Sequence, residues 1–286
     1  MAVDGSLNIP TDNSSLMHAV ESAATHGVLS LSTKVIPEDS ASLQQPTRSS
    51  DEDPPQTYKV LVQDAMPVVQ GMKKTPSIRT FKDLQDDFVK RIKTLMQQYQ
   101  EERIAFDDYP DRPTSLKDKT HQKRAVTSTD YEIHPNMKLK MSLKELLSSS
   151  KTKKAITIMF AKALLQYFSQ SDKRLVVIYD GKIEDDRRLL LYHTHEEADT
   201  IIANQILSAT ENDYVTEIHA RSPFTDIFMT FMDLVSHGKL RLQAKLMFLT
   251  GKGDKHHQID VPERVCTVGP MKAQGLIGLH NLSGAD

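Results

Sequence analysis

The sequence predicts an α/β domain in which a mostly parallel central sheet is flanked by helices. Three observations support this fold class. Short β-branched or apolar segments recur between residues 58 and 261, helical patterns separate several of them, and residues 175–179 are apolar throughout. A continuously apolar strand is expected to be buried on both faces, as in a parallel sheet covered by helices.

The composition narrows the class of protein. The chain has 286 residues, a net charge of −2 and a single cysteine, Cys266. Near-neutral charge argues against a broad nucleic-acid coat but allows a local basic patch. A lone cysteine excludes an intrachain disulfide and a Cys-rich zinc site, so we expect an intracellular location, with the nucleus as one option. No apolar run could span a membrane, and no membrane partner is expected.

The domain organisation follows from a change in composition near residue 57. Residues 1–56 are rich in Ser, Thr, Asp and Pro, and only 38% of the whole chain is hydrophobic. Such a segment is expected to be a flexible N-terminal extension. Residues 57–286 carry the periodic patterns and are expected to form one domain. The sequence does not specify the oligomeric state.

The domain is expected to begin with two strands and a capped helix. Residues 58–64 and 103–107 are short apolar segments, and each ends in an aspartate. Between them, Thr80 can cap a helix, with Asp83 three residues further on. Apolar residues recur at spacings of three and four from residue 81 to residue 99, which is typical of an amphipathic helix.

Strands and helices continue to alternate in the rest of the chain. Helices are predicted from Ser142, which is followed by Glu145 in a capping-box pattern, and over residues 156–168, 227–232 and 271–282. Strands are predicted over residues 175–179, 189–192, 214–219, 240–250 and 255–261, the last two as a hairpin. Residues 184–188 are three acids followed by two arginines, and they predict a charged loop.

The residues between the strand at 189–192 and the next amphipathic segment are the most informative stretch. Residues 193–200 read His-Thr-His-Glu-Glu-Ala-Asp-Thr, and they predict a turn that opens a helix. Thr194 and Glu197 fit a capping box, and acids at a helix N-terminus are favoured by the helix dipole. One interpretation is that these acids only stabilise the start of the helix. The other is that they take part in chemistry.

A chemical role is favoured because other acids end other strands in the same way. These are Asp64, Asp107, Glu197 and Asp226. If the strands are parallel neighbours, their carboxyl ends meet at one edge, where ligands bind in such sheets. Several carboxylates cannot all stay ionised in a small space unless a cation neutralises them. Carboxylate oxygens suit Mg²⁺ or Mn²⁺, which can activate water against a phosphodiester.

Several motifs resemble those of the PIN-like nuclease superfamily, and within it the flap-endonuclease branch. Residues 62–66 (Val-Gln-Asp-Ala-Met) and 104–107 (Ile-Ala-Phe-Asp) are similar to its first two acidic motifs. Residues 197–199 (Glu-Ala-Asp), 222–226 (Ser-Pro-Phe-Thr-Asp) and 282–286 (Leu-Ser-Gly-Ala-Asp) resemble the later ones. The motif His-Glu-Glu-Ala-Asp-Thr is similar to one in a poorly characterised, often transposon-associated group of animal proteins.

The resemblance implies a metal-dependent nuclease-like domain that hydrolyses DNA or RNA with water as the nucleophile. It covers the chain from about residue 58 to the end. The implied catalytic residues and ligands of Mg²⁺ or Mn²⁺ are Asp64, Asp107, Glu197, Asp199, Asp226 and Asp286. The implied nucleic-acid contacts are Lys117, Lys119, Lys123 and Arg124, although a solvated basic face is the alternative interpretation of that run.

Two departures from the family pattern support an alternative function. Phe224 stands where the family has an acid, and a phenyl ring cannot bind a metal ion. The chain ends at Asp286, where relatives continue into a helical DNA-binding region, so the domain is expected to be truncated there. The alternative is a binding or relic module that has lost the chemistry. A third possibility, a nucleotide-binding α/β protein, needs a glycine-rich loop, which residues 64–67 (Asp-Ala-Met-Pro) do not supply.

Overall fold

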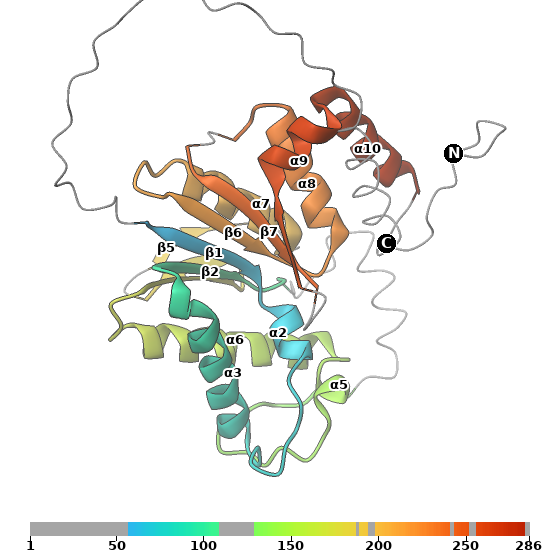
Figure 1. The fold of residues 1–286 in the computed structure, drawn as a ribbon. Helices are drawn as coiled ribbons and strands as arrows, with labels where there is room; N and C mark the ends of the chain where they lie inside the picture. The colour runs from blue at the N-terminus through green and yellow to red at the C-terminus, as the bar shows by residue number, and fades with distance from the viewer. Residues whose placement is uncertain are drawn as a thin grey trace, which may run out of the picture.

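The computed structural model describes residues 57–108, 129–186, 189–193, 198–240, 243–251 and 256–283. These residues form an α/β fold around an eight-stranded sheet (Figure 1). None of the helices in these ranges has the length and apolar character needed to cross a bilayer. The predicted N-terminal extension, residues 1–56, lies outside the described residues.

The sheet has the strand order β5-β4-β3-β2-β1-β6-β7-β8. The strands are β1 (Lys59–Asp64), β2 (Glu101–Ala105), β3 (Arg174–Tyr179), β4 (Lys182–Asp185), β5 (Leu189–Tyr192), β6 (Glu217–Arg221), β7 (Lys245–Thr250) and β8 (His257–Asp260). The five central strands are parallel, whereas β4, β5 and β8 pair antiparallel at the two edges. The predicted fold class, a mostly parallel sheet flanked by helices, is therefore confirmed.

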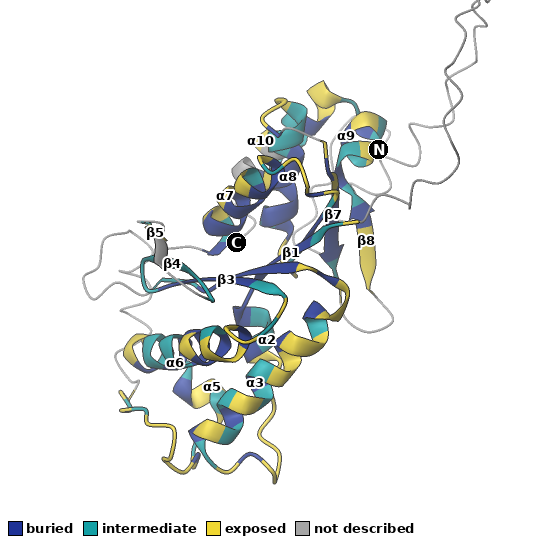
Figure 2. Ribbon diagram, turned by 90° about the vertical axis from the view of Figure 1, so that its left-hand side faces the viewer, coloured by how far each residue is buried: buried dark blue, intermediate teal, exposed yellow. Residues whose placement is uncertain are grey.

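Helices cover both faces of the sheet, and their inner faces are buried (Figure 2). The helices on one face are α2 (Met66–Gln70), α3 (Phe81–Leu95), α5 (Leu143–Leu146) and α6 (Ser150–Phe168). Those on the other face are α7 (Ala198–Thr210), α8 (Thr225–Ser236), α9 (Val261–Val268) and α10 (Pro270–Ser283). A 3₁₀ turn, Met96–Gln98, links α3 to β2.

Local sequence explains where several helices begin. The Thr80 hydroxyl accepts a hydrogen bond from the Asp83 amide at 3.1 Å, and the Asp83 carboxylate accepts from the Thr80 amide at 2.9 Å. This is the reciprocal capping box that satisfies two amides at the start of α3. At α5 the Ser142 hydroxyl accepts from the Glu145 amide, which is one half of the same motif. The cap predicted at Thr80 is therefore confirmed, and at Ser142 the N-cap is confirmed without the reciprocal bond of a full capping box.

The structure corrects the first part of the charged loop predicted for residues 184–188. Glu184 and Asp185 belong to β4 (Lys182–Asp185), which pairs antiparallel with β3, and residues 187–188 lie outside the described residues. The cause is the turn at Asp180 and Gly181, whose φ angles are both positive, at 48° and 69°. A two-residue turn of that kind folds a chain back into a hairpin. The predicted strand that follows is confirmed as β5, but it is an antiparallel edge strand.

Candidate functional site

Three of the predicted acids lie at the carboxyl edge of the central strands. Asp64 is the last residue of β1, Asp107 comes two residues after β2, and Asp199 lies in the first turn of α7. Strands β1 and β2 are parallel neighbours, with Asp64 opposite Ala105. The register therefore brings the ends of both strands together, and α7 packs against both of them.

Asp64 is the most buried of these acids, with an exposed fraction of 5%. Its Oδ1 accepts a hydrogen bond from the Met66 amide at 2.7 Å. Burial raises the pKa of Asp64 to about 7, and the nearby charge of Asp107 adds to that rise, as does Asp199. The Met66 amide and Lys153 act in the opposite direction. Asp64 is thus a carboxyl group whose ionisation near neutral pH depends on positive charge beside it.

Asp107 connects the end of β2 to the start of α7. Its Oδ1 accepts a hydrogen bond from the Ala198 amide at 3.2 Å. The first amides of a helix have no partner inside the helix, and a carboxylate there is favoured by the helix dipole. This contact fixes the first turn of α7, and with it Asp199, beside the ends of β1 and β2.

Lys153 supplies positive charge to the same place from α6. Burial lowers the pKa of this lysine, and the charges of Asp107 and Asp64 act to raise it. The ammonium group therefore lies within electrostatic range of both carboxylates. Lys153 could not be singled out from the sequence, because nothing in a helical run of lysines shows which one is turned inward.

Asp226 has a different environment. It lies in the first turn of α8, and its Oδ1 is 2.8 Å from Nε2 of His280 in α10. His280 is buried, so this contact joins the two helices. The charges that act most strongly on Asp64 do not include Asp226. Phe224 occupies the N-cap position of α8, where its side chain makes no capping hydrogen bond, and 41% of it is exposed.

The remaining predicted site residues lie outside the described part of the chain. These are Glu197, Asp286, Lys117, Lys119, Lys123 and Arg124. Among the residues that the structure describes, no group of three or more His, Cys, Asp or Glu side chains is arranged to hold a metal ion. Asp107 and Asp199 act electrostatically on Asp64, but the three acids do not form such a group.

A lysine-lined hollow opens beside the carboxylates, and we call it the lysine hollow. It has a volume of about 800 Å³ and is lined by Lys73, Lys74, Lys140, Lys144 and Lys153, with Ser142 and neutral residues between them. The Lys74 ammonium donates to the Lys140 carbonyl at 3.3 Å, which holds two walls together. Lys153 lines the hollow and also acts electrostatically with Asp64 and Asp107, so it links the two features.

Comparison with known proteins assigns no family. A scan against protein-family models finds no match, and a search of the curated proteins finds no matching relative. The PIN-like resemblance therefore stays a proposal that rests on the motifs and on the position of the acids.

Proposed function

We propose that this chain is a metal-dependent, nuclease-like domain with a PIN-like fold of the flap-endonuclease type, acting on the phosphodiesters of DNA or RNA. One observation carries the proposal. Asp64, Asp107 and Asp199 come from three separate elements and meet at the carboxyl edge of the parallel strands. Ligand sites of open α/β sheets lie at that edge.

The residues at this edge fit a hard divalent ion by their donor atoms. Asp64 and Asp107 offer carboxylate oxygens, which suit Mg²⁺ or Mn²⁺, and Asp199 stands next to them. Glu197 directly precedes α7 and is the residue proposed to complete the ligand set. A bound ion lowers the pKa of a coordinated water and neutralises charge on the phosphate.

Lys153 and the lysine hollow would hold the substrate. The Lys153 ammonium lies within electrostatic range of Asp64 and Asp107, so it could donate a charge-assisted hydrogen bond to a phosphate held at the acids. The other lysines of the hollow can hold neighbouring phosphates of the same strand. The proposed path for nucleic acid therefore includes residues that are far apart in sequence, in addition to the run from Lys117 to Arg124.

A specific observation favours the second candidate, a binding or relic module without chemistry. Asp226 bonds to His280 instead of acting on Asp64, and Phe224 replaces an acid in the same motif. A site with fewer ligands would hold an ion weakly. The lysine hollow would bind nucleic acid in either case.

Cleavage assays separate the two candidates. We expect the folded chain with Mn²⁺ to cut fluorescent single-stranded or flap substrates of DNA or RNA. Asp64→Asn and Asp107→Asn should each reduce the rate at least about tenfold, because even outer-sphere partners cause losses of that size at metal sites. Asp86→Asn is the matched control, since Asp86 is an exposed α3 residue paired with Lys82.

Two outcomes would favour the relic module. One is binding of these substrates without cleavage by the wild-type chain in either Mg²⁺ or Mn²⁺. The other is cleavage that appears only in a Phe224→Asp variant, which would indicate chemistry that the natural chain has lost.

A further inference from the structure

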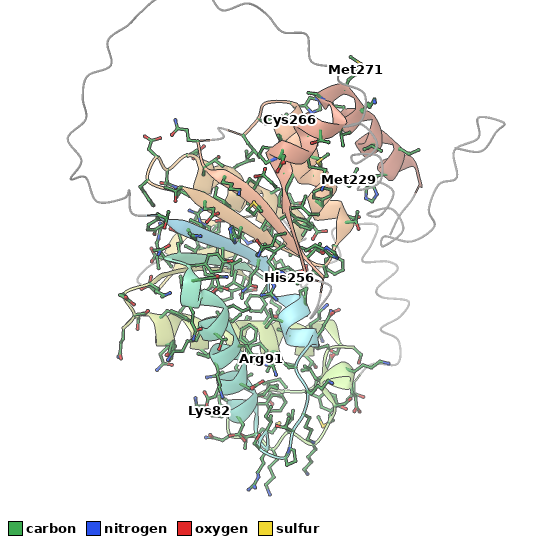
Figure 3. All side chains as sticks on the ribbon, in the orientation of Figure 1. Lys82, Arg91, Met229, His256, Cys266 and Met271 are labelled. Atoms are coloured by element: carbon green, nitrogen blue, oxygen red, sulfur yellow. The ribbon has the colours of Figure 1, made fainter. Side chains whose placement is uncertain are left out.

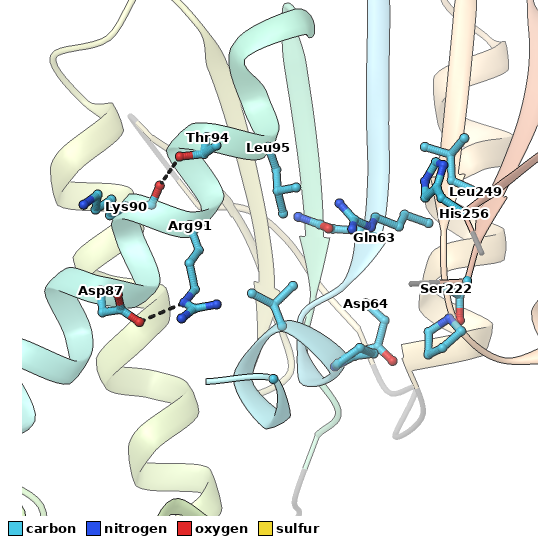
Figure 4. Close-up of a pocket in the computed structure, with 16 residues that line it drawn as sticks. Gln63, Asp64, Asp87, Lys90, Arg91, Thr94, Leu95, Ser222, Leu249 and His256 are labelled. Carbon is cyan, nitrogen blue, oxygen red and sulfur yellow. Dashed lines mark hydrogen bonds and ion pairs between the residues drawn. The ribbon is translucent and has the colours of Figure 1, made fainter. Parts of the chain in front are cut away.

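A second pocket lies where the strand order reverses. From β1 the chain proceeds outward through β2 and β3 on one side, then returns to the other side of β1 with β6 and β7. At this switch point the pocket opens between the ends of β1, β6 and β7 and the helices α2 and α3 (Figure 4). Its volume of about 440 Å³ lies in the usual range of small-molecule sites. We call it the switch-point pocket.

Basic side chains reach this pocket from several elements. Lys90 and Arg91 come from α3, Arg221 from the end of β6, and His256 from the segment before β8. Figure 3 places Arg91 on the α3 side and His256 near the ends of the strands. Arg91 is paired with Asp87 at 2.8 Å, whereas Lys90 is exposed on the same helix. Lys90 and Arg221 are the cations best placed to receive an anionic group.

The inner wall of the pocket combines apolar surface with one buried amide. Leu95 and Leu249 line the pocket and belong to a small apolar cluster with Leu61 and Tyr99. Gln63 is fully buried and also lines the pocket. One end of its amide is hydrogen-bonded to Glu102, and its Oε1 has no partner among the described residues. A buried carbonyl oxygen without a donor is costly, and a ligand donor would remove that cost.

We propose that the switch-point pocket binds a nucleotide unit whose base carries an exocyclic amino group. The phosphate would lie on Lys90 and Arg221, the base would pack between Leu95 and Leu249, and the amino group would donate to Gln63 Oε1. Side-chain cations replace the glycine-rich loop that a nucleotide site of the usual kind needs. Asp64 also lines the pocket, so this site adjoins the acids. The proposed contacts use none of the acids, and the proposal does not depend on catalysis there.

Calorimetric titration of the full chain in EDTA tests this proposal without the metal site. We expect AMP and CMP to bind at least about tenfold more tightly than UMP, because UMP has no exocyclic amino group for Gln63. Gln63→Leu should reduce AMP binding to the level of UMP. Lys90→Gln should weaken all three nucleotides similarly, and this exposed residue can be changed without disturbing the core. Lys82→Gln, an exposed α3 variant outside the pocket, is the matched control.

These titrations contain no metal ion, so failure of the nuclease proposal would not affect their result. A further arm separates related explanations. Comparison of AMP with the dinucleotide ApA distinguishes a free nucleotide from a chain end, and tighter binding of either one supports the pocket. Equal affinity for AMP and UMP, or AMP affinity unaltered by Lys90→Gln, would overturn the proposal, as would the absence of AMP binding by the wild-type chain.

Discussion

Burial raises the pKa values of two acidic residues in the central strands β1 and β2. Asp64 at the end of β1 is nearly buried, and burial with the charge of Asp107 raises its pKa to about 7. Glu102 in β2 is fully buried, and burial raises its pKa to about 8, although the Gln63 amide and the charge of Arg221 oppose the rise. Glu102 is therefore mainly neutral at pH 7, and its role is structural.

Glu102 gives a prediction about stability and pH. Its pKa is about 8 in the folded chain and near its ordinary value of 4.5 in the unfolded chain, so the folded state binds more protons between these values. Stability from this group is complete below pH 4.5 and is lost as the pH rises to about 8. Glu102→Gln cannot ionise, so the variant should gain stability relative to wild type between pH 5.5 and 8.5, by more than about 1.4 kcal/mol.

Urea unfolding at several pH values measures this difference. Glu145→Gln, which removes an exposed carboxylate, should show no comparable trend. A constant difference between Glu102→Gln and wild type across that pH range would mean that Glu102 is ionised in the folded chain.

The sequence indicated some site residues and could not indicate others. Asp64 and Asp107 were predictable because each ends a short apolar strand, and a parallel sheet aligns such ends. The lysines of the lysine hollow were not predictable, because its walls come from distant parts of the chain: Lys74 and Lys140 are 66 residues apart in the sequence. The environment of Asp226 was also hidden, since its partner His280 is 54 residues away.

At the scale of elements, the spacing of apolar residues predicted helices correctly where the pattern extended over many residues. The predicted α3 and α6 are confirmed, and Phe88 of α3 stacks on Phe160 of α6 with ring centroids 4.4 Å apart. Shorter elements were missed, among them α2, β4 and α9. Each has too few residues to show a period, and α2 and α9 contain proline near their first turn.

The N-terminus of α3 gives the prediction at this scale. Thr80→Ala removes the hydroxyl that accepts from the Asp83 amide, and it should cost about 1 kcal/mol of unfolding free energy. Thr94→Ala is the control from the same helix, because the Thr94 hydroxyl only donates to the Lys90 carbonyl within α3. If urea unfolding shows that both variants lose the same unfolding free energy, the capping box does not add to the stability of the chain.

At the scale of the whole molecule, one arrangement underlies the functional proposals. Five parallel strands end at the same edge, where Asp64 acts electrostatically with Asp107 and Asp199 and also lines the switch-point pocket. Alternation along the sequence predicted the parallel sheet. It could not specify the order of the strands, and that order decides which acids become neighbours.

Manganese binding tests the central claim most directly. Calorimetric titration of the folded chain with Mn²⁺ should give weak binding, because Phe224 stands where a ligand is expected. That binding should be lost in both Asp64→Asn and Asp107→Asn and kept in Asp86→Asn. If wild-type protein binds no Mn²⁺, or if both variants bind it as well as wild type, the carboxyl-edge acids are not a metal site and the proposal is contradicted.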